Sequence, residues 1–197
     1  MMRSAVLTSA AVCALMLCNG AGAQGAVPSL ADLVRDADQV VTGTVERLAT
    51  VWEDVDMKKD GPPARLVLTY YEVTPSEVFK GQQRDRLLPR ILGGRLDGYA
   101  YIHVQGTPMS SGEQAVLFLS ESETPRAETG ELAHYLHHGA AGKVRVGSED
   151  GKTIVYRTDK GCATGCGQAT ATEQVSYSEF RQLLLDAVEQ ERAGARE

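Results

Sequence analysis

Residues 65–94 read RLVLTYYEVTPSEVFKGQQRDRLLPRILGG, and this stretch decides the fold. In its first half, Tyr71 and Val73 fall at alternate positions, and Val67 and Thr69 extend the same face, as a half-buried strand requires. Pro75 has no backbone N–H, so the strand must lie at a sheet edge or carry a bulge there. Lys80 and Gly81 predict a tight turn, followed by a second strand that ends at Gly93 and Gly94.

The segments on either side of this stretch are also rich in strand patterns. Ala115–Leu119 reads AVLFL without a polar residue, which predicts a strand covered on both faces. Gly43 indicates a bulge or a close backbone approach within its strand. Further predicted strands are Gln39–Leu48, Tyr99–Val104, Leu132–His138, Lys143–Val146 and Thr153–Arg157.

A helix is expected at each end of these strands. Ser29 followed by Asp32 predicts an N-terminal cap, and Ser176 followed by Glu179 predicts the same for a second helix. Apolar residues then recur at helical spacing in both segments. We therefore expect a mainly β protein with flanking helices (α+β): a small, curved, antiparallel barrel, OB-like, with one N-terminal and one C-terminal helix.

The first 23 residues have the pattern of a signal peptide. Arg3 precedes the apolar run Ala5–Cys18, and Ala21-Gly22-Ala23 is a small-residue cleavage site. Cleavage there leaves one domain, residues 24–197, in a secreted or periplasmic location. No later segment has the length and apolarity of a membrane-spanning helix, so we expect no membrane anchor after cleavage.

The charge balance argues against two classes of partner. The chain carries 20 Lys and Arg against 26 Asp and Glu, a net charge of −6. Nucleic acids and anionic membranes both favour basic surfaces. We therefore expect no nucleic-acid partner. An extracytoplasmic protein is the partner class that the sequence favours, with edge strands and Trp52 offering contact surface.

The exported chain retains one pair of cysteines, Cys162 and Cys166. In an oxidising compartment such a pair predicts a structural disulfide. Half of a zinc site and a redox-active pair are the alternatives. The three-residue spacer in a glycine-rich segment differs from the two-residue spacer of thioredoxin-type motifs.

The histidines are the main chemical signal. His134 and His138 lie four residues apart and would share one face of a strand, whereas His137 would point to the other face. With His103 from another strand, His134 and His138 form the metal-ligand set that the sequence predicts. The alternative is that these histidines are solvent-exposed or hydrogen-bonded residues of an outer strand.

No catalytic motif is recognisable. A Gly-x-Ser-x-Gly elbow is absent, and Gly93-Gly94 lacks the lysine and the helix of a phosphate-binding loop. Asp54, Asp56 and Asp60 form an acidic cluster, but lysines occupy the middle of the segment where a calcium loop needs ligands. The sequence therefore predicts neither a catalytic residue nor a bound cofactor.

The chain resembles a group of uncharacterised secreted bacterial proteins over Leu30–Val146. The segments that carry the resemblance are LADLVRDADQVVTGTV (30–45), YYEVTPSEVFKG (70–81), LGG (92–94), SGEQAVLFLS (111–120) and the strand that begins GKV (142–144). More distantly, a helix-flanked curved barrel is similar to OB folds of the netrin and metalloproteinase-inhibitor type. That likeness implies a fold, with protease inhibition as an expectation by analogy.

The leading functional hypothesis is an exported, non-enzymatic β-barrel module that binds a protein or another extracytoplasmic ligand. One alternative is a metal-binding protein or metal-dependent enzyme using His134 and His138. The other is the protease inhibitor implied by the distant likeness.

Overall fold

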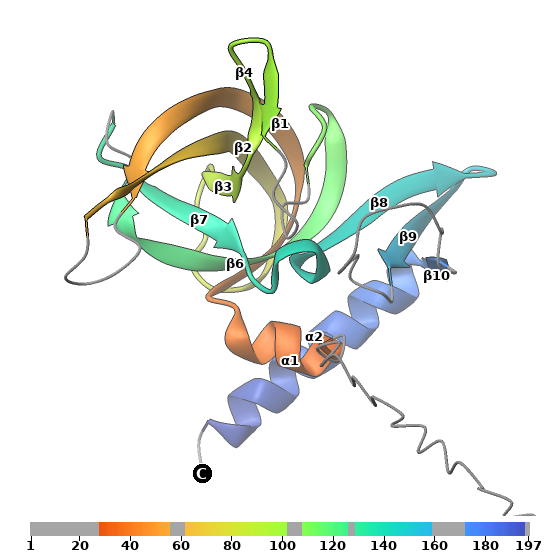
Figure 1. Cartoon of the computed structure of the whole chain (residues 1–197). Coiled ribbons are helices and arrows are strands. Elements are labelled where there is room, and N and C mark those ends of the chain that lie inside the picture. Colours follow the sequence, from red (N-terminus) through yellow and green to blue (C-terminus); the bar gives the residue numbers. More distant parts are fainter. Residues whose placement is uncertain (1–27, 56–61, 102–107, 126–128, 159–171, 196–197) are drawn as a thin grey trace, which may run out of the picture.

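The computed structural model describes residues 28–55, 62–101, 108–125, 129–158 and 172–195 (Figure 1). The signal-peptide prediction for residues 1–23 and the predictions for His103, Cys162 and Cys166 lie outside these residues. The described elements are α1 (Leu30–Asp36), β1 (Gln39–Val55), β2 (Ala64–Lys80), β3 (Pro89–Leu92), β4 (Gly94–Leu96), β5 (Tyr99–Tyr101), β6 (Glu113–Pro125), β7 (Leu132–Leu136), a 3-10 turn (Gly139–Gly142), β8 (Lys143–Glu149), β9 (Lys152–Thr158), β10 (Thr172–Ser176) and α2 (Tyr177–Gly194). The prediction of a mainly β chain with one helix at each end is confirmed.

Five strands close into a ring within one curved sheet. Their order is β1-β2-β3-β7-β6, and β6 pairs back onto β1. All of these pairings are antiparallel except β3 with β7, which is parallel, so the expectation of a wholly antiparallel arrangement is wrong at this one place. From β6 the sheet continues outward through β8, β9 and β10. The ring lies above the two helices in Figure 1.

The pairing of β1 with β2 is interrupted by a bulge in β2. The register moves from Thr42 opposite Glu77 to Gly43 opposite Pro75, which leaves Ser76 as the extra residue. The predictions for Pro75 and Gly43 are both confirmed. A Cβ atom on Gly43 would lie 2.7 Å from the Thr74 carbonyl oxygen, so only glycine permits this close strand approach.

Gly43→Ala is therefore expected to lower the free energy of unfolding by about 1–3 kcal/mol, because the added methyl group meets backbone that cannot rotate away. Urea denaturation followed by circular dichroism measures the change. Gly194→Ala is the matched control, since a Cβ atom there meets nothing within 4 Å. Equal stability of the two variants would contradict the close-approach explanation.

The expected hairpin at Gly81 is wider than predicted. β2 does end at Lys80, and Gly81 has a φ of +95°. However, β3 begins only at Pro89 and pairs with Leu68–Tyr70, near the other end of β2. The intervening QQRDR segment is polar and has no apolar alternation, so it offers no side chains for a buried strand face.

The first long strand extends beyond its predicted end at Leu48. β1 continues to Val55, and Trp52 pairs with Val67 of β2. The Trp52 side chain is 39% exposed.

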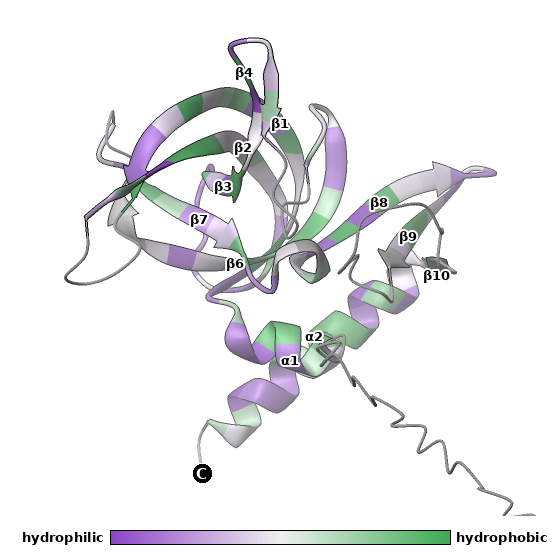
Figure 2. Cartoon of the chain, in the orientation of Figure 1, coloured by the Kyte–Doolittle hydropathy of each residue, from purple (hydrophilic) through white to green (hydrophobic). Residues whose placement is uncertain are grey.

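Two hydrophobic clusters share β6. All five residues of Ala115–Leu119 are fully buried, which confirms the prediction of a strand covered on both faces. Val116 and Phe118 pack with residues of α1 and α2, whereas Ala115, Leu117 and Leu119 pack with β1, β2 and β3 residues. Figure 2 shows hydrophobic ribbon where α1 and α2 meet. Among the described residues, no helix is both long and apolar enough to cross a membrane.

Candidate metal centre

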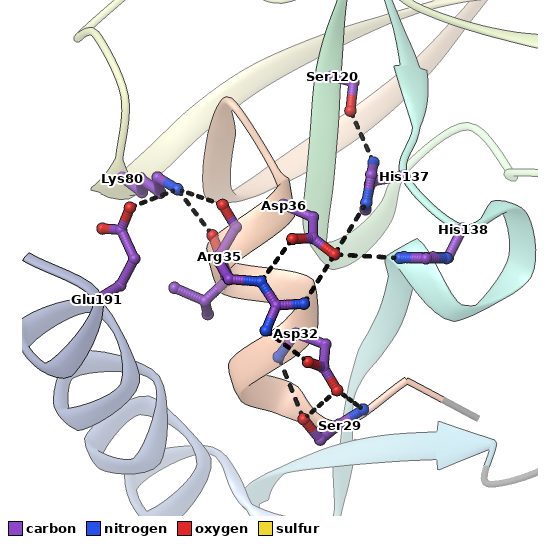
Figure 3. Close-up of polar contacts among 10 residues, drawn as sticks. Ser29, Asp32, Arg35, Asp36, Lys80, Ser120, His137, His138 and Glu191 are labelled. Atoms are coloured by element: carbon purple, nitrogen blue, oxygen red, sulfur yellow. Dashed lines mark hydrogen bonds and ion pairs between the residues drawn. The ribbon is translucent and has the colours of Figure 1, made fainter. Parts of the chain in front are cut away.

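Three side chains of metal-ligating type converge beside α1. The ligand atoms of Asp36, His137 and His138 all lie within 4.8 Å of one another. Asp36 is the last residue of α1, and the two histidines follow β7 directly. Figure 3 shows both imidazole rings directed toward the Asp36 carboxylate.

The ends of α1 fix the position of Asp36. At the start, Ser29 and Asp32 form the predicted capping box, with the Asp32 N–H donating to Ser29 Oγ at 3.1 Å. At the end, the Lys80 ammonium group donates to the carbonyl oxygens of Val34 and Arg35 at 2.9 and 3.0 Å. A cation at the C-terminus of a helix also interacts favourably with the helix dipole. The last turn of α1 is thereby attached to the end of β2.

Arg35 keeps Asp36 in its ionised form. Its Nε donates to Asp36 Oδ1 at 2.7 Å, and its Nη2 donates to Oδ2 at 3.2 Å. These hydrogen bonds hold the pKa of Asp36 below its ordinary value. The Arg35 side chain is 60% exposed, and its Nη1 also pairs with Asp32 Oδ1 at 2.8 Å. Asp36 therefore presents a carboxylate, the form that binds metal ions.

A left-handed turn brings the two histidines to the same side. His138 has a φ of +53°, and Gly139 follows it with a φ of +59°. In a strand, neighbouring side chains point to opposite faces. Here the rings of His137 and His138 are edge-to-face with centroids 4.2 Å apart. Close packing fixes this turn, since a Cβ atom on Gly142 would lie 2.2 Å from the His137 carbonyl oxygen.

Ser120 of β6 orients the first of these rings. Its Oγ and His137 Nδ1 are 2.8 Å apart and hydrogen-bonded. The tautomer in which Nδ1 donates to Ser120 leaves the lone pair on Nε2, the atom that faces Asp36. Among the described residues, buried Nε2 of His137 has no hydrogen-bond partner. Burial, together with the neighbouring His138, lowers the pKa of His137, which favours the neutral imidazole that binds metals.

The spacing of these atoms fits a shared ion better than direct hydrogen bonds. Asp36 Oδ2 lies 3.9 Å from His137 Nε2 and 3.7 Å from His138 Nε2. Both distances are too long for a hydrogen bond. Ligands bound about 2.1 Å from a tetrahedral zinc ion lie about 3.4 Å apart. A small inward movement of each side chain would bring all three into coordination.

The ligand set predicted from the sequence differs from this group. β7 ends at Leu136, so His138 leaves the strand that the prediction had placed it on with His134. His134 remains on β7, is 1% exposed, and is not part of the converging group. His103 lies outside the described residues.

Asp36 and Ser120 were not among the predicted site residues, and His137 was predicted to point away from His138. Asp36 is remote in the sequence, and a strand assignment directed His137 away from His138. One signal was present: the dipeptide His137-His138 is followed by Gly139, a residue that favours the left-handed turns in which neighbouring side chains can meet.

Comparisons with protein-family models, curated proteins and solved structures found no match for this chain.

Proposed function

We propose that this protein binds a divalent transition-metal ion through Asp36, His137 and His138. The observation that carries the proposal is the placement of one carboxylate oxygen 3.7 and 3.9 Å from two imidazole nitrogens, without a hydrogen bond between them. Ser120 supports it, because metal-binding histidines usually donate their second ring N–H to a neighbouring acceptor.

The donor set favours particular ions. Imidazole suits zinc, iron, nickel and copper, whereas calcium and magnesium prefer oxygen ligands. Two histidines and one carboxylate with further positions open are found with zinc and with ferrous iron. Asp36, His137 and His138 offer such a set and come from two separate segments, so a bound ion would join the end of α1 to the turn after β7.

The signal-peptide pattern of the first residues supports the proposal that the protein binds metal after export from the cytoplasm. Residues 1–23 have the charged, apolar and small-residue order of a signal peptide. The proposed function is thus that of an exported metal-binding β domain.

Zinc titration tests the proposal. Untagged protein, freed of metal with a chelator, is titrated with Zn²⁺ by calorimetry, and we expect one equivalent to bind. Asp36→Asn and His137→Ala should each lower the affinity about 100-fold or more, because each removes a direct ligand. Ser120→Ala should lower it about 10- to 100-fold through loss of ring orientation.

Asp54→Asn is the matched control, because Asp54 is an exposed aspartate of β1 outside the converging group. Its affinity for zinc should be within about threefold of the wild-type affinity, a difference in binding free energy of under about 1 kcal/mol. Loss of binding in His103→Ala with no effect of Asp36→Asn would instead favour the ligand set predicted from the sequence. Absence of stoichiometric zinc binding would contradict the proposal.

A further inference from the structure

A second candidate site lies at the end of the ring away from the helices. A cavity of about 350 Å³ is bounded by β1, β2, the β3–β4 junction, β5 and Met109. The β4–β5 hairpin stands over this end of the ring in Figure 1, and α1 and α2 lie beyond the other end. The volume is within the range of small-molecule sites.

The inner wall of the cavity is apolar and held in place. Ile91 and Met109 are 9% and 5% exposed, and both belong to the hydrophobic cluster inside the ring. The Met109 N–H donates to the hydroxyl oxygen of Tyr71 at 3.3 Å, which attaches the segment before β6 to β2. This wall suits the apolar body of a ligand.

The hairpin approaches the ring closely enough to form a fixed second wall. Gly94 lies against Thr69, and a Cβ atom on it would be 2.2 Å from Thr69 Oγ1. The Thr69 hydroxyl donates to the Gly93 carbonyl oxygen at 2.7 Å, and the Gly93 N–H donates to the Val67 carbonyl oxygen at 2.7 Å. The shape of the cavity is therefore set by the position of the backbone and does not depend on one side-chain rotamer.

The charge around this cavity is positive. Arg47 and Arg95 line it, and no aspartate or glutamate does so among the described residues. Neither guanidinium pairs with a described carboxylate, in contrast to Arg84, Arg86 and Arg90. Arg47 Nη2 donates to Thr50 Oγ1 at 2.7 Å, which positions this group at the cavity. On a chain of net charge −6, two arginines without a carboxylate partner in the described part of the chain create a local attraction for anions at this cavity.

An aromatic pair extends the site outward. Tyr101 lines the cavity, and its ring meets Trp52 edge-to-face with centroids 5.1 Å apart. The Arg65 guanidinium lies over the Trp52 ring, 5.6 Å from the ring centroid. Trp52 is the single tryptophan of the chain, so its fluorescence reports on this region alone.

We propose that this cavity binds a small organic anion. The apolar body of the ligand lies against Ile91, Met109 and Tyr101, and its acidic group is held by Arg47 and Arg95. This binding site is separate from the metal centre and does not depend on it.

The test uses anilinonaphthalene sulfonate, a fluorescent aromatic anion. We expect saturable binding at one site, with quenching of Trp52 emission by energy transfer to the probe. Arg47→Gln and Arg95→Gln should each weaken binding about tenfold, and the double variant about 100-fold, because each loses one charge-assisted contact. Phenylnaphthylamine, which lacks the sulfonate, should bind at least about tenfold more weakly than the anion.

Arg145→Gln is the matched control, because it removes an exposed arginine that does not line this cavity. It should leave probe affinity within about twofold of wild type. Circular dichroism verifies that each variant is folded. The proposal is overturned by probe binding without Trp52 quenching, by equal binding of the neutral analogue, or by equal effects of Arg145→Gln and Arg47→Gln.

Discussion

Arg90→Met is expected to lower the free energy of unfolding by about 3–5 kcal/mol, because it leaves a buried carboxylate without its cationic partner. The side chains of Arg90 and Glu53 are only 11% and 10% exposed, and their charged atoms lie 3.9 Å apart. Arg90 Nη2 also donates to Ser122 Oγ at 2.8 Å, and the Tyr70 hydroxyl donates to Glu53. These residues come from β1, β2, β3 and β6, so the network connects four strands of the ring.

Equilibrium unfolding in urea measures this cost, with two comparisons that isolate its cause. Arg86→Met removes an arginine that is 52% exposed and paired with surface carboxylates, so it should cost less than about 1 kcal/mol. The double variant Glu53→Leu/Arg90→Met removes both buried charges and should be more stable than Arg90→Met alone. Equal losses in Arg90→Met and Arg86→Met would show that the buried pair does not stabilise the ring.

The sequence predicted those features that depend on local chemistry. Ser29 and Ser176 cap helices because the residues three positions later complete the capping boxes. Pro75 requires a bulge because of its missing N–H, and the unbroken apolar run at Ala115–Leu119 requires cover on two faces. Each of these constraints acts within a few residues, so it can be recognised without knowing the fold.

The features that were missed depend on contacts between distant segments. The parallel pairing of β3 with β7 places Pro89 opposite His134, and no periodicity in either short segment indicates it. Arg90 was not recognised as part of a buried network for the same reason. At the candidate metal centre, strand alternation paired His134 with His138, but the left-handed conformation at His138 replaced alternation with a turn. A single backbone conformation thus changed the ligand set.

His134 leads to the second prediction, a loss of stability on acidification. Its ring is 1% exposed, and neither ring nitrogen has a hydrogen-bond partner among the described residues. Burial and the charge of Arg84 lower the pKa of His134, and the carboxylates of Glu121 and Asp38 oppose this shift without reversing it. The folded protein therefore keeps His134 neutral at a pH where the unfolded chain has already bound a proton.

The direction of the pH dependence follows from this difference. Above the unfolded pKa of about 6.5, His134 is neutral in both states and folding stability is unaffected by it. As the pH falls below that value, the unfolded state binds more protons, so stability decreases by up to about 1.4 kcal/mol per pH unit until the folded pKa is reached. The relevant window therefore begins near neutral pH and extends downward.

His134→Leu should remove this contribution while filling the same buried space. Urea unfolding is measured at about pH 7 and about pH 5, with a chelator present to exclude bound metal. As the pH falls, the free energy of unfolding of the variant should rise relative to that of wild type by up to about 2 kcal/mol. Tyr135→Leu, at an exposed neighbour on the same strand, should follow the wild-type pH dependence. If His134→Leu and wild type differed in free energy of unfolding by the same amount at both pH values, His134 would have the same pKa in the folded and unfolded chains. The buried ring would then have no part in the acid sensitivity of the fold.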